Sequence, residues 1–137
     1  MNNNNEILYI KQGNRESIIY YLDDKNKKEG VLTNLLNKWC LEELTTYKGR
    51  MEAIREKFHL RKYVPIYINE ELMLMPTTTK NDIDIIYINI VNILKIEKND
   101  NKSKIIFKNR KELILNVDYE KLNRFYCRCI NIYQLIK

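Results

Sequence analysis

Residues 86–97 read IYINIVNILKIE, and this stretch decides the fold class. Ile86, Ile88 and Ile90 alternate with other side chains, which is the pattern of a strand that buries one face. The pattern predicts one strand along the whole stretch. The polar cluster Asn99-Asp100-Asn101 follows and predicts a turn. A strand that runs directly into a turn favours antiparallel hairpins.

The chain after this turn continues the alternation of strands and turns. Strands are expected at 104–108 and 112–117, joined through the polar residues 109–111. Together they predict a meander of antiparallel hairpins. The end of the chain, 119–137, has apolar residues at helical spacing and predicts a C-terminal helix. Its expected apolar face contains Leu122, Phe125, Tyr126, Cys129, Ile130, Tyr133 and Ile136.

Two helices are expected before the strand that begins at residue 86. The segment 33–44 has apolar residues at helical spacing, and Thr33 is a candidate cap for its start. The segment 47–61 shows the same spacing, and Pro65 prevents the helix from continuing further. The residues of this segment expected to face the core are Met51, Ile54 and Phe58.

Short strands are expected on both sides of the two helices. Segments 6–11 and 17–22 read as a first pair, followed by a charged loop at 23–30. Segments 66–68 and 72–75 read as a second pair. Helices and antiparallel strands that follow one another in this order predict an α+β fold.

The composition agrees with one folded domain. Of 137 residues, 45% are hydrophobic and only three are Gly, which argues against disorder and long linkers. We therefore expect a single domain over residues 1–137, with an antiparallel β-hairpin meander packed with two or three helices, including the C-terminal helix. The Asn-rich start, residues 1–5, is expected to be frayed.

The chain is basic, and its cations are clustered. The formal net charge is +6, which favours nucleic acid, acidic membrane surfaces or acidic proteins as partners. Residues 48–62 hold six cations and two carboxylates, and Arg side chains among them match phosphate geometry and fit narrow minor grooves. The cations are Lys48, Arg50, Arg55, Lys57, Arg61 and Lys62. A solvated helix face with pairs such as Glu52 with Arg55 fits the pattern equally well.

The loop Thr77-Thr78-Thr79-Lys80 offers three hydroxyls and one ammonium group. Hydroxyls and free backbone N–H groups are usual phosphate contacts. An ordinary turn with a capping hydroxyl explains the same residues, and taken alone the loop favours that interpretation.

The Cys and His residues give little support for a metal or catalytic site. Cys127 and Cys129 lie two apart on the expected helix and point about 200° apart, so they do not easily share one ion. Cys40 and His59 would complete four zinc ligands, but nothing in the sequence brings the four together. Buried thiols are favoured. No phosphate-binding glycine loop or carboxylate pair is recognisable, so we expect no cofactor and no enzymatic activity.

The sequence also predicts a cytoplasmic protein. The start of the chain is an Asn run and lacks the charged and apolar regions of a targeting segment. The most apolar stretch, 83–96, is too short and too polar to span a bilayer. Three Cys residues, an odd number, fit a reducing cytosol.

Three short motifs resemble the competence transcription factor (ComK) family. Residues 45–53, TTYKGRMEA, are similar to the family's Gly-Arg element. Residues 62–68, KYVPIYI, resemble its Lys-x-Pro-Ile stretch, and residues 75–79, MPTTT, resemble its Phe-Pro-Thr-x-Ser loop. The strands and turns from 86 to 119 then follow the family's order. The order and spacing of the motifs carry the resemblance.

The resemblance implies a transcription activator of competence and DNA-uptake genes that binds paired A/T-rich boxes, reads the minor groove and forms an oligomer. Paired boxes favour a dimer, with the C-terminal helix as a natural dimer surface. Gly49 would have a backbone role near the start of its helix. The expected contacts to double-stranded DNA, some from the motifs and some from charge alone, are Lys48, Arg50, Arg55, Lys57, Arg61, Lys62, Thr77, Thr78, Thr79 and Lys80.

Other classes of protein remain compatible with the sequence. A non-enzymatic adaptor would use the basic helix 47–62 to bind acidic proteins. A small metal-binding protein would use the Cys and His residues. An RNA reader would need exposed aromatic side chains for base stacking, and the ten Tyr residues do not exclude it.

Overall fold

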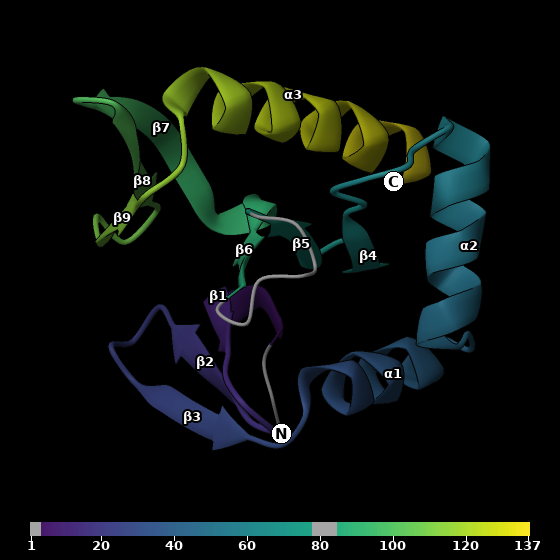
Figure 1. Cartoon of the computed structure of the whole chain (residues 1–137). Coiled ribbons are helices and arrows are strands. Elements are labelled where there is room, and N and C mark those ends of the chain that lie inside the picture. Colours follow the sequence, from purple (N-terminus) through teal and green to yellow (C-terminus); the bar gives the residue numbers. More distant parts are fainter. Residues whose placement is uncertain (1–3, 78–84) are drawn as a thin grey trace.

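The computed structural model describes residues 4–77 and 85–137, and it has an α+β fold (Figure 1). The predicted fold class and the C-terminal helix are confirmed. In chain order the elements are η1 (Asn4–Glu6), β1 (Ile7–Gln12), β2 (Ser17–Tyr21), β3 (Asn26–Glu29), α1 (Leu32–Glu42), α2 (Tyr47–Phe58), β4 (Ile66–Asn69), β5 (Leu72–Pro76), β6 (Ile86–Asn89), η2 (Ile90–Asn92), β7 (Ile93–Asn99), β8 (Lys102–Phe107), β9 (Glu112–Leu115) and α3 (Tyr119–Ile136).

The strands form two antiparallel sheets. A six-stranded sheet has the order β3-β2-β1-β6-β5-β4, and a three-stranded sheet has the order β7-β8-β9. The centre of the larger sheet is the pairing of β1 with β6, in which Tyr9 is opposite Ile88. This pairing joins the N-terminal hairpin to strands from the middle of the chain, and no local sequence pattern indicated it.

The stretch 86–97 is not one strand, as its alternation predicted. It divides into β6, the 3-10 turn η2 and β7, and the two strands belong to different sheets. Asn89, fully buried, lies at the division. Its amide donates to the carbonyls of Ile7 at 3.0 Å and Glu71 at 3.1 Å, and its Oδ1 accepts from the N–H of Met73 at 3.1 Å. A polar side chain with these partners stabilises a corner between the sheets, because buried polar groups need hydrogen bonds.

Asn92 extends the same corner toward the N-terminus. Its Nδ2 donates to the carbonyls of Asn5 at 2.9 Å and Ile7 at 2.8 Å. Of residues 1–5, which we expected to be frayed, Asn4 and Asn5 are described and belong to the 3-10 turn η1. The buried amide of Asn92 uses the Asn5 carbonyl as one of its partners, because buried polar groups need hydrogen bonds.

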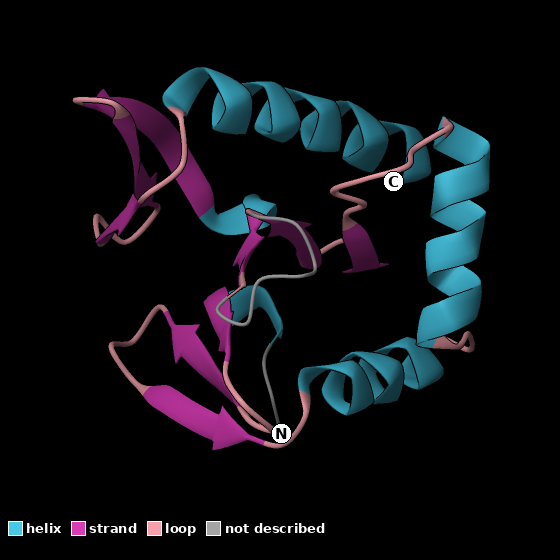
Figure 2. Cartoon of the chain, viewed as in Figure 1, coloured by secondary structure: helices cyan, strands magenta, loops and turns pink. Residues whose placement is uncertain are grey.

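The six-stranded sheet lies between two hydrophobic clusters. Figure 2 shows the helices α3 and α1 at the top and the bottom of the view, with strands between them. β5 is buried on both faces: Leu72 and Leu74 belong to the cluster with α1, and Met73 and Met75 belong to the cluster with α3. The α3 cluster also includes residues of the three-stranded sheet, such as Phe107. α3 therefore covers both sheets on one side, and α1 covers the larger sheet on the other.

Three local predictions were wrong. The charged segment 23–30 contains the edge strand β3, whose exposed side chains lack the apolar alternation that marks a half-buried strand. α1 begins after Val31 without a side-chain cap, so Thr33 lies inside the helix. α2 ends at Phe58, because His59 adopts a left-handed conformation with φ of 56°. No helix in the described parts of the chain is long and apolar enough to cross a membrane.

Candidate nucleic-acid interface

The two faces of α2 divide the basic cluster. Lys48 and Arg55 are spaced seven residues apart on one face, and both line a pocket of about 500 Å³ together with Arg61 and Lys62. Arg50 and Lys57 lie on another face and line a separate, mostly apolar pocket with Gly49, Ala53 and Phe58. Four of the six expected cations are thus brought together, and two are directed elsewhere.

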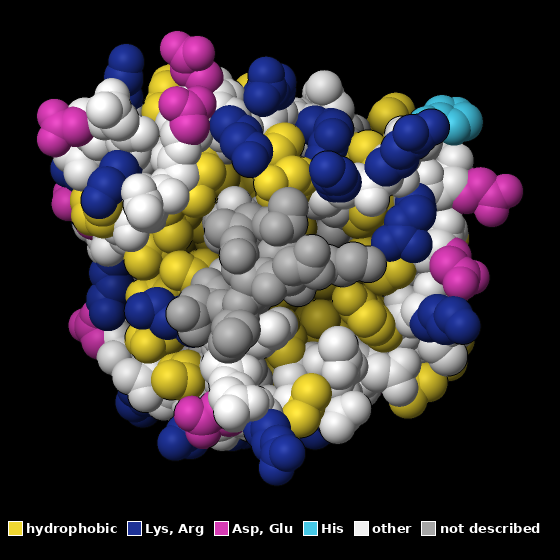
Figure 3. Space-filling view, viewed as in Figure 1, with side chains coloured by type: hydrophobic (Ala, Val, Ile, Leu, Met, Phe, Trp, Pro, Cys, Tyr) yellow, Lys and Arg dark blue, Asp and Glu magenta, His cyan; other side chains and the backbone are white. Residues whose placement is uncertain are grey.

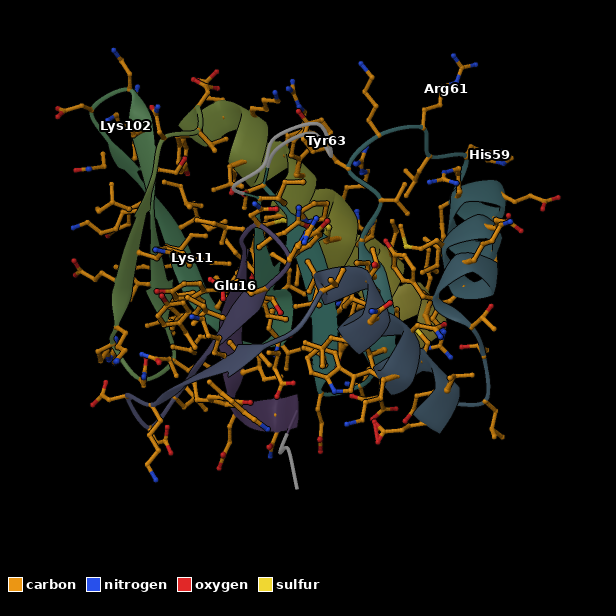
Figure 4. The ribbon with its side chains drawn as sticks, turned by 60° about the horizontal axis from the view of Figure 1, so that its bottom comes forward. Lys11, Glu16, His59, Arg61, Tyr63 and Lys102 are labelled. Carbon is orange, nitrogen blue, oxygen red and sulfur yellow. The ribbon has the colours of Figure 1, made fainter. Side chains whose placement is uncertain are left out.

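The chain segment 59–64, which follows α2, presents two of these four cations. His59 and Tyr63 both have positive φ, 56° and 55°, and these residues reverse the chain direction at each end. The buried side chains of Leu60 and Val64 hold the segment on the core. Arg61, which lies between them, is exposed and points away from the body of the protein (Figure 4). Lys62 is exposed as well.

α3 adds cations that the sequence analysis missed. Lys121, Arg124 and Arg128 are spaced by three and four residues and therefore share one side of the helix. Arg128 is half-buried, and its Nη2 lies 3.3 Å from the carbonyls of Lys62 and Tyr63 and donates to both. It therefore has an anchoring role, and its charge adds to this surface. Lys121 Nζ lies 5.1 Å from the centre of the Tyr63 ring. The spacing of these three cations is visible in the sequence, but the prediction for this helix used only its apolar residues.

These side chains form one surface, named here the basic face: Lys48, Arg55, Arg61, Lys62, Lys121, Arg124 and Arg128. Figure 3 shows Lys and Arg atoms along the edge over α3 and at the corner with the end of α2. The five ion pairs between described residues all lie on strands, hairpins and turns, so none of them involves a cation of the basic face. Glu52 is the one carboxylate among the described residues that line the same pocket. The pair of Glu52 with Arg55, which a solvated helix would favour, is not among the five ion pairs.

Arg50 connects α2 to the edge of the larger sheet. Its Nη1 donates to the carbonyls of Tyr67 and Ile68, both at 2.7 Å, and its guanidinium lies 5.9 Å from the centre of the Tyr67 ring. Tyr67 and Ile68 belong to β4, which is an edge strand of the larger sheet. Arg50 therefore fastens α2 to the sheet edge and does not extend into solvent as a DNA contact would.

We expect Arg50→Ala to lower the free energy of unfolding by about 2 kcal/mol, because it removes two charge-assisted hydrogen bonds from half-buried carbonyls. Urea denaturation followed by circular dichroism measures the change. Arg55→Ala is the matched control, since Arg55 is exposed on the same helix and should change stability by less than about 0.5 kcal/mol. Equal midpoints for the two variants would contradict the role of Arg50.

Thr77 is not available for a phosphate contact. Its side chain is only 3% exposed, and its hydroxyl and its N–H both donate to the carbonyl of Ile86, at 2.9 and 3.1 Å. The hydroxyl therefore extends the pairing of β5 with β6. Thr78, Thr79 and Lys80, the other expected contacts of this loop, lie outside the described residues.

Gly49 has a packing role at the start of α2. Thr46 caps the helix, and its hydroxyl oxygen accepts from the Gly49 N–H at 2.9 Å. A Cβ at position 49 would meet that same oxygen at 2.9 Å, which is closer than side chains tolerate. The absence of a side chain thus allows the cap to form, and Gly49 needs no unusual backbone angle.

The Cys and His residues do not assemble. Cys40 lies in the α1 cluster, Cys129 lies in the α3 cluster, and Cys127 is exposed. Burial raises the pKa of the Cys129 thiol to about 12, so it stays protonated and is a poor metal ligand at neutral pH. Within residues 4–77 and 85–137 no group of three or more His, Cys, Asp or Glu side chains could hold a metal ion. The four residues on which the metal-binding alternative depended therefore lie apart in the described structure.

Comparison with known proteins adds one match. The family model described as ComK protein matches residues 7–137. No curated protein and no solved structure gives a significant match. The family match extends beyond the motifs at residues 45–79 and includes α3, whose cations join the basic face. The chain belongs to the ComK protein family.

Proposed function

We propose that this chain is a cytoplasmic transcription regulator that binds double-stranded DNA through its basic face. Membership of the ComK family favours a competence transcription factor over an enzyme. The observation that carries the proposal is the convergence of cations from α2, segment 59–64 and α3 without neutralising ion pairs among the described residues. Such a surface attracts the phosphates of DNA and releases their counterions.

The arrangement favours contact with the minor groove of A/T-rich DNA. A/T tracts narrow this groove and deepen its negative potential, which attracts Arg side chains without a full base code. Arg55 and Arg61 are the candidates to enter the groove, because both are exposed and line the same pocket. Lys48, Lys62 and Lys121 would then contact phosphates on either side. Arg50 supports this surface by holding α2 in place.

Paired A/T-rich boxes in competence and DNA-uptake promoters would require two copies of the chain. The two-fold symmetry of a dimer matches two boxes one or more helical turns apart. Tyr126 and Tyr133 of α3 are only partly buried, which leaves part of this helix available to a second copy. We propose that the protein activates such promoters as a dimer or higher oligomer.

Fluorescence anisotropy with an A/T-tract duplex and a G/C-rich duplex of equal length tests the proposal. We expect tighter binding to the A/T-tract duplex. We also expect log K to fall with log salt at a slope of about −4 to −5, since about five cations, the three lysines and the two arginines in the groove, displace counterions from the DNA. No binding to either duplex at low salt would overturn DNA binding and leave the basic face as a docking surface for acidic proteins. Equal affinity for both duplexes would overturn the minor-groove mechanism.

A further inference from the structure

The pocket beside α2 is more than a patch of positive charge. Its volume of about 500 Å³ lies in the range of small-molecule sites. Met51, Val64 and Pro76 line it with apolar surface, while Arg55 and Arg61 add cations. In Figure 3 hydrophobic atoms lie in the recess between the grey segment and the cations over α2. A duplex offers phosphates to the cations, but its stacked bases leave the apolar part of such a recess unfilled.

Tyrosine rings and hydroxyls supply the rest of the pocket. Tyr47, Tyr63 and Tyr87 all line it. Burial raises the pKa of Tyr87 to about 12, and burial also raises the pKa of Tyr47, so both side chains stay neutral phenols that can donate hydrogen bonds. The rings of Tyr47 and Tyr87 offer surfaces for stacking, and their hydroxyls offer donors to a polar edge, whereas the Tyr63 ring already packs against Phe125.

The pocket therefore combines features that match a planar, aromatic anion. Cations accept a phosphate group, and Arg in particular binds it bidentately. Tyrosine rings and apolar side chains accept a planar base. Glu52, which also lines the pocket, supplies an acceptor for a ribose hydroxyl or a base amino group. Inorganic phosphate alone would leave the aromatic surface unused, and a nucleoside alone would leave the cations unused.

We propose that this pocket binds a nucleoside monophosphate, and that bound nucleotide competes with DNA. The competition rests on the proposed function, because Arg55, Arg61 and Lys62 belong both to the pocket and to the basic face. A phosphate group held by these cations neutralises the charge that DNA needs. The nucleotide is thus a regulator of DNA binding at the same surface.

Isothermal titration calorimetry with the four ribonucleoside 5′-monophosphates tests the site on the whole chain without DNA. At least one of them should bind about tenfold or more tightly than its nucleoside and than inorganic phosphate, because each component fills only part of the pocket. Phosphate binding as tight as that of every nucleotide would overturn the proposal, since the tyrosines would then contribute nothing. No heat from any nucleotide would overturn it as well.

Two variants separate the pocket from general charge effects. Tyr47→Phe combined with Tyr87→Phe keeps both rings and removes both hydroxyls, so nucleotide affinity should fall by about three- to tenfold. Lys57→Ala is the matched control, because it removes a cation from a different face of α2 and should leave nucleotide affinity unchanged. An equal loss in both variants would overturn the assignment of the pocket. Unchanged urea midpoints show that each variant is folded.

Fluorescence anisotropy with the A/T-tract duplex distinguishes a failure of the nucleotide proposal from a failure of the proposed DNA-binding function. Added nucleotide should release the wild-type protein from DNA and should release the double Tyr→Phe variant only at about three- to tenfold higher concentration. Nucleotide binding without DNA binding would overturn the regulation and leave the pocket in place. DNA binding that nucleotide does not weaken would overturn the competition while the DNA-binding function stands.

Discussion

Replacing Asn89 by Ala should lower the free energy of unfolding by about 3 kcal/mol, because it leaves the buried N–H of Met73 without its partner and removes one donor from each of two carbonyls. These are the carbonyl of Glu71 and the carbonyl of Ile7, which keeps only the hydrogen bond from Asn92. Each unsatisfied buried group costs about 1 to 3 kcal/mol. Domains of this size are stable by only about 5–15 kcal/mol, so the variant should be close to unfolding at 37 °C. Urea denaturation at 15 °C measures the loss.

Two further variants make the Asn89 result specific. Asn89→Asp keeps the acceptor for the Met73 N–H and loses both donors, so it separates the two functions of the amide. It should be destabilised at least as strongly as Asn89→Ala at pH 7, because a carboxylate then faces two carbonyl oxygens. Asn34→Ala, an exposed position in α1, should change stability by less than about 0.5 kcal/mol. A loss below about 1 kcal/mol for Asn89→Ala would contradict the role of this corner.

The corner at Asn89 also explains which parts of the fold the sequence could predict. Helices and most strands have local periodicity, and it predicted segments 6–11, 17–22 and 119–137, which correspond to β1, β2 and α3. The division of 86–97 into two strands depends on hydrogen bonds between Asn89 and Ile7, which are 82 residues apart. Ile86, Ile88 and Ile90 are two residues apart, whereas Ile93 and Ile96 are three apart. This change of spacing is a weak local signal, and it does not say that the two halves belong to different sheets.

The sequence predicted the chemistry of the candidate site but not which residues form it. Charge clustering pointed to α2 and segment 59–64, and Arg55, Arg61 and Lys62 do share a pocket. Charge alone could not distinguish the faces of α2, because the direction of Arg50 is set by carbonyls in β4. Arg128 joined the site through its contact with Lys62, 66 residues away. Long-range packing, which sequence spacing does not encode, decided both outcomes.

Removing one cation from each element of the basic face should weaken binding to the A/T-tract duplex by about 100-fold at 0.15 M salt. The variant combines Arg55→Ala, Lys62→Ala and Arg124→Ala. Each cation lost from the DNA contact lowers the counterion slope by about 0.9, which corresponds to about fivefold in affinity at this salt concentration. The slope of log K against log salt should therefore fall in magnitude by about 2.7. Anisotropy across a salt series measures both quantities.

A second triple variant shows whether the face or the net charge is responsible. Lys27→Ala, Lys57→Ala and Lys95→Ala also remove three positive charges, but from β3, the other face of α2, and β7. Long-range attraction falls equally in both triples, because it depends on the total charge of +6. Direct phosphate contacts fall only in the first. The control should therefore lose no more than about fivefold in affinity and keep the salt slope of the wild type. Equal losses of affinity in the two triple variants would mean that DNA binding depends only on the net charge of the protein. The basic face would then have no special role in recognition.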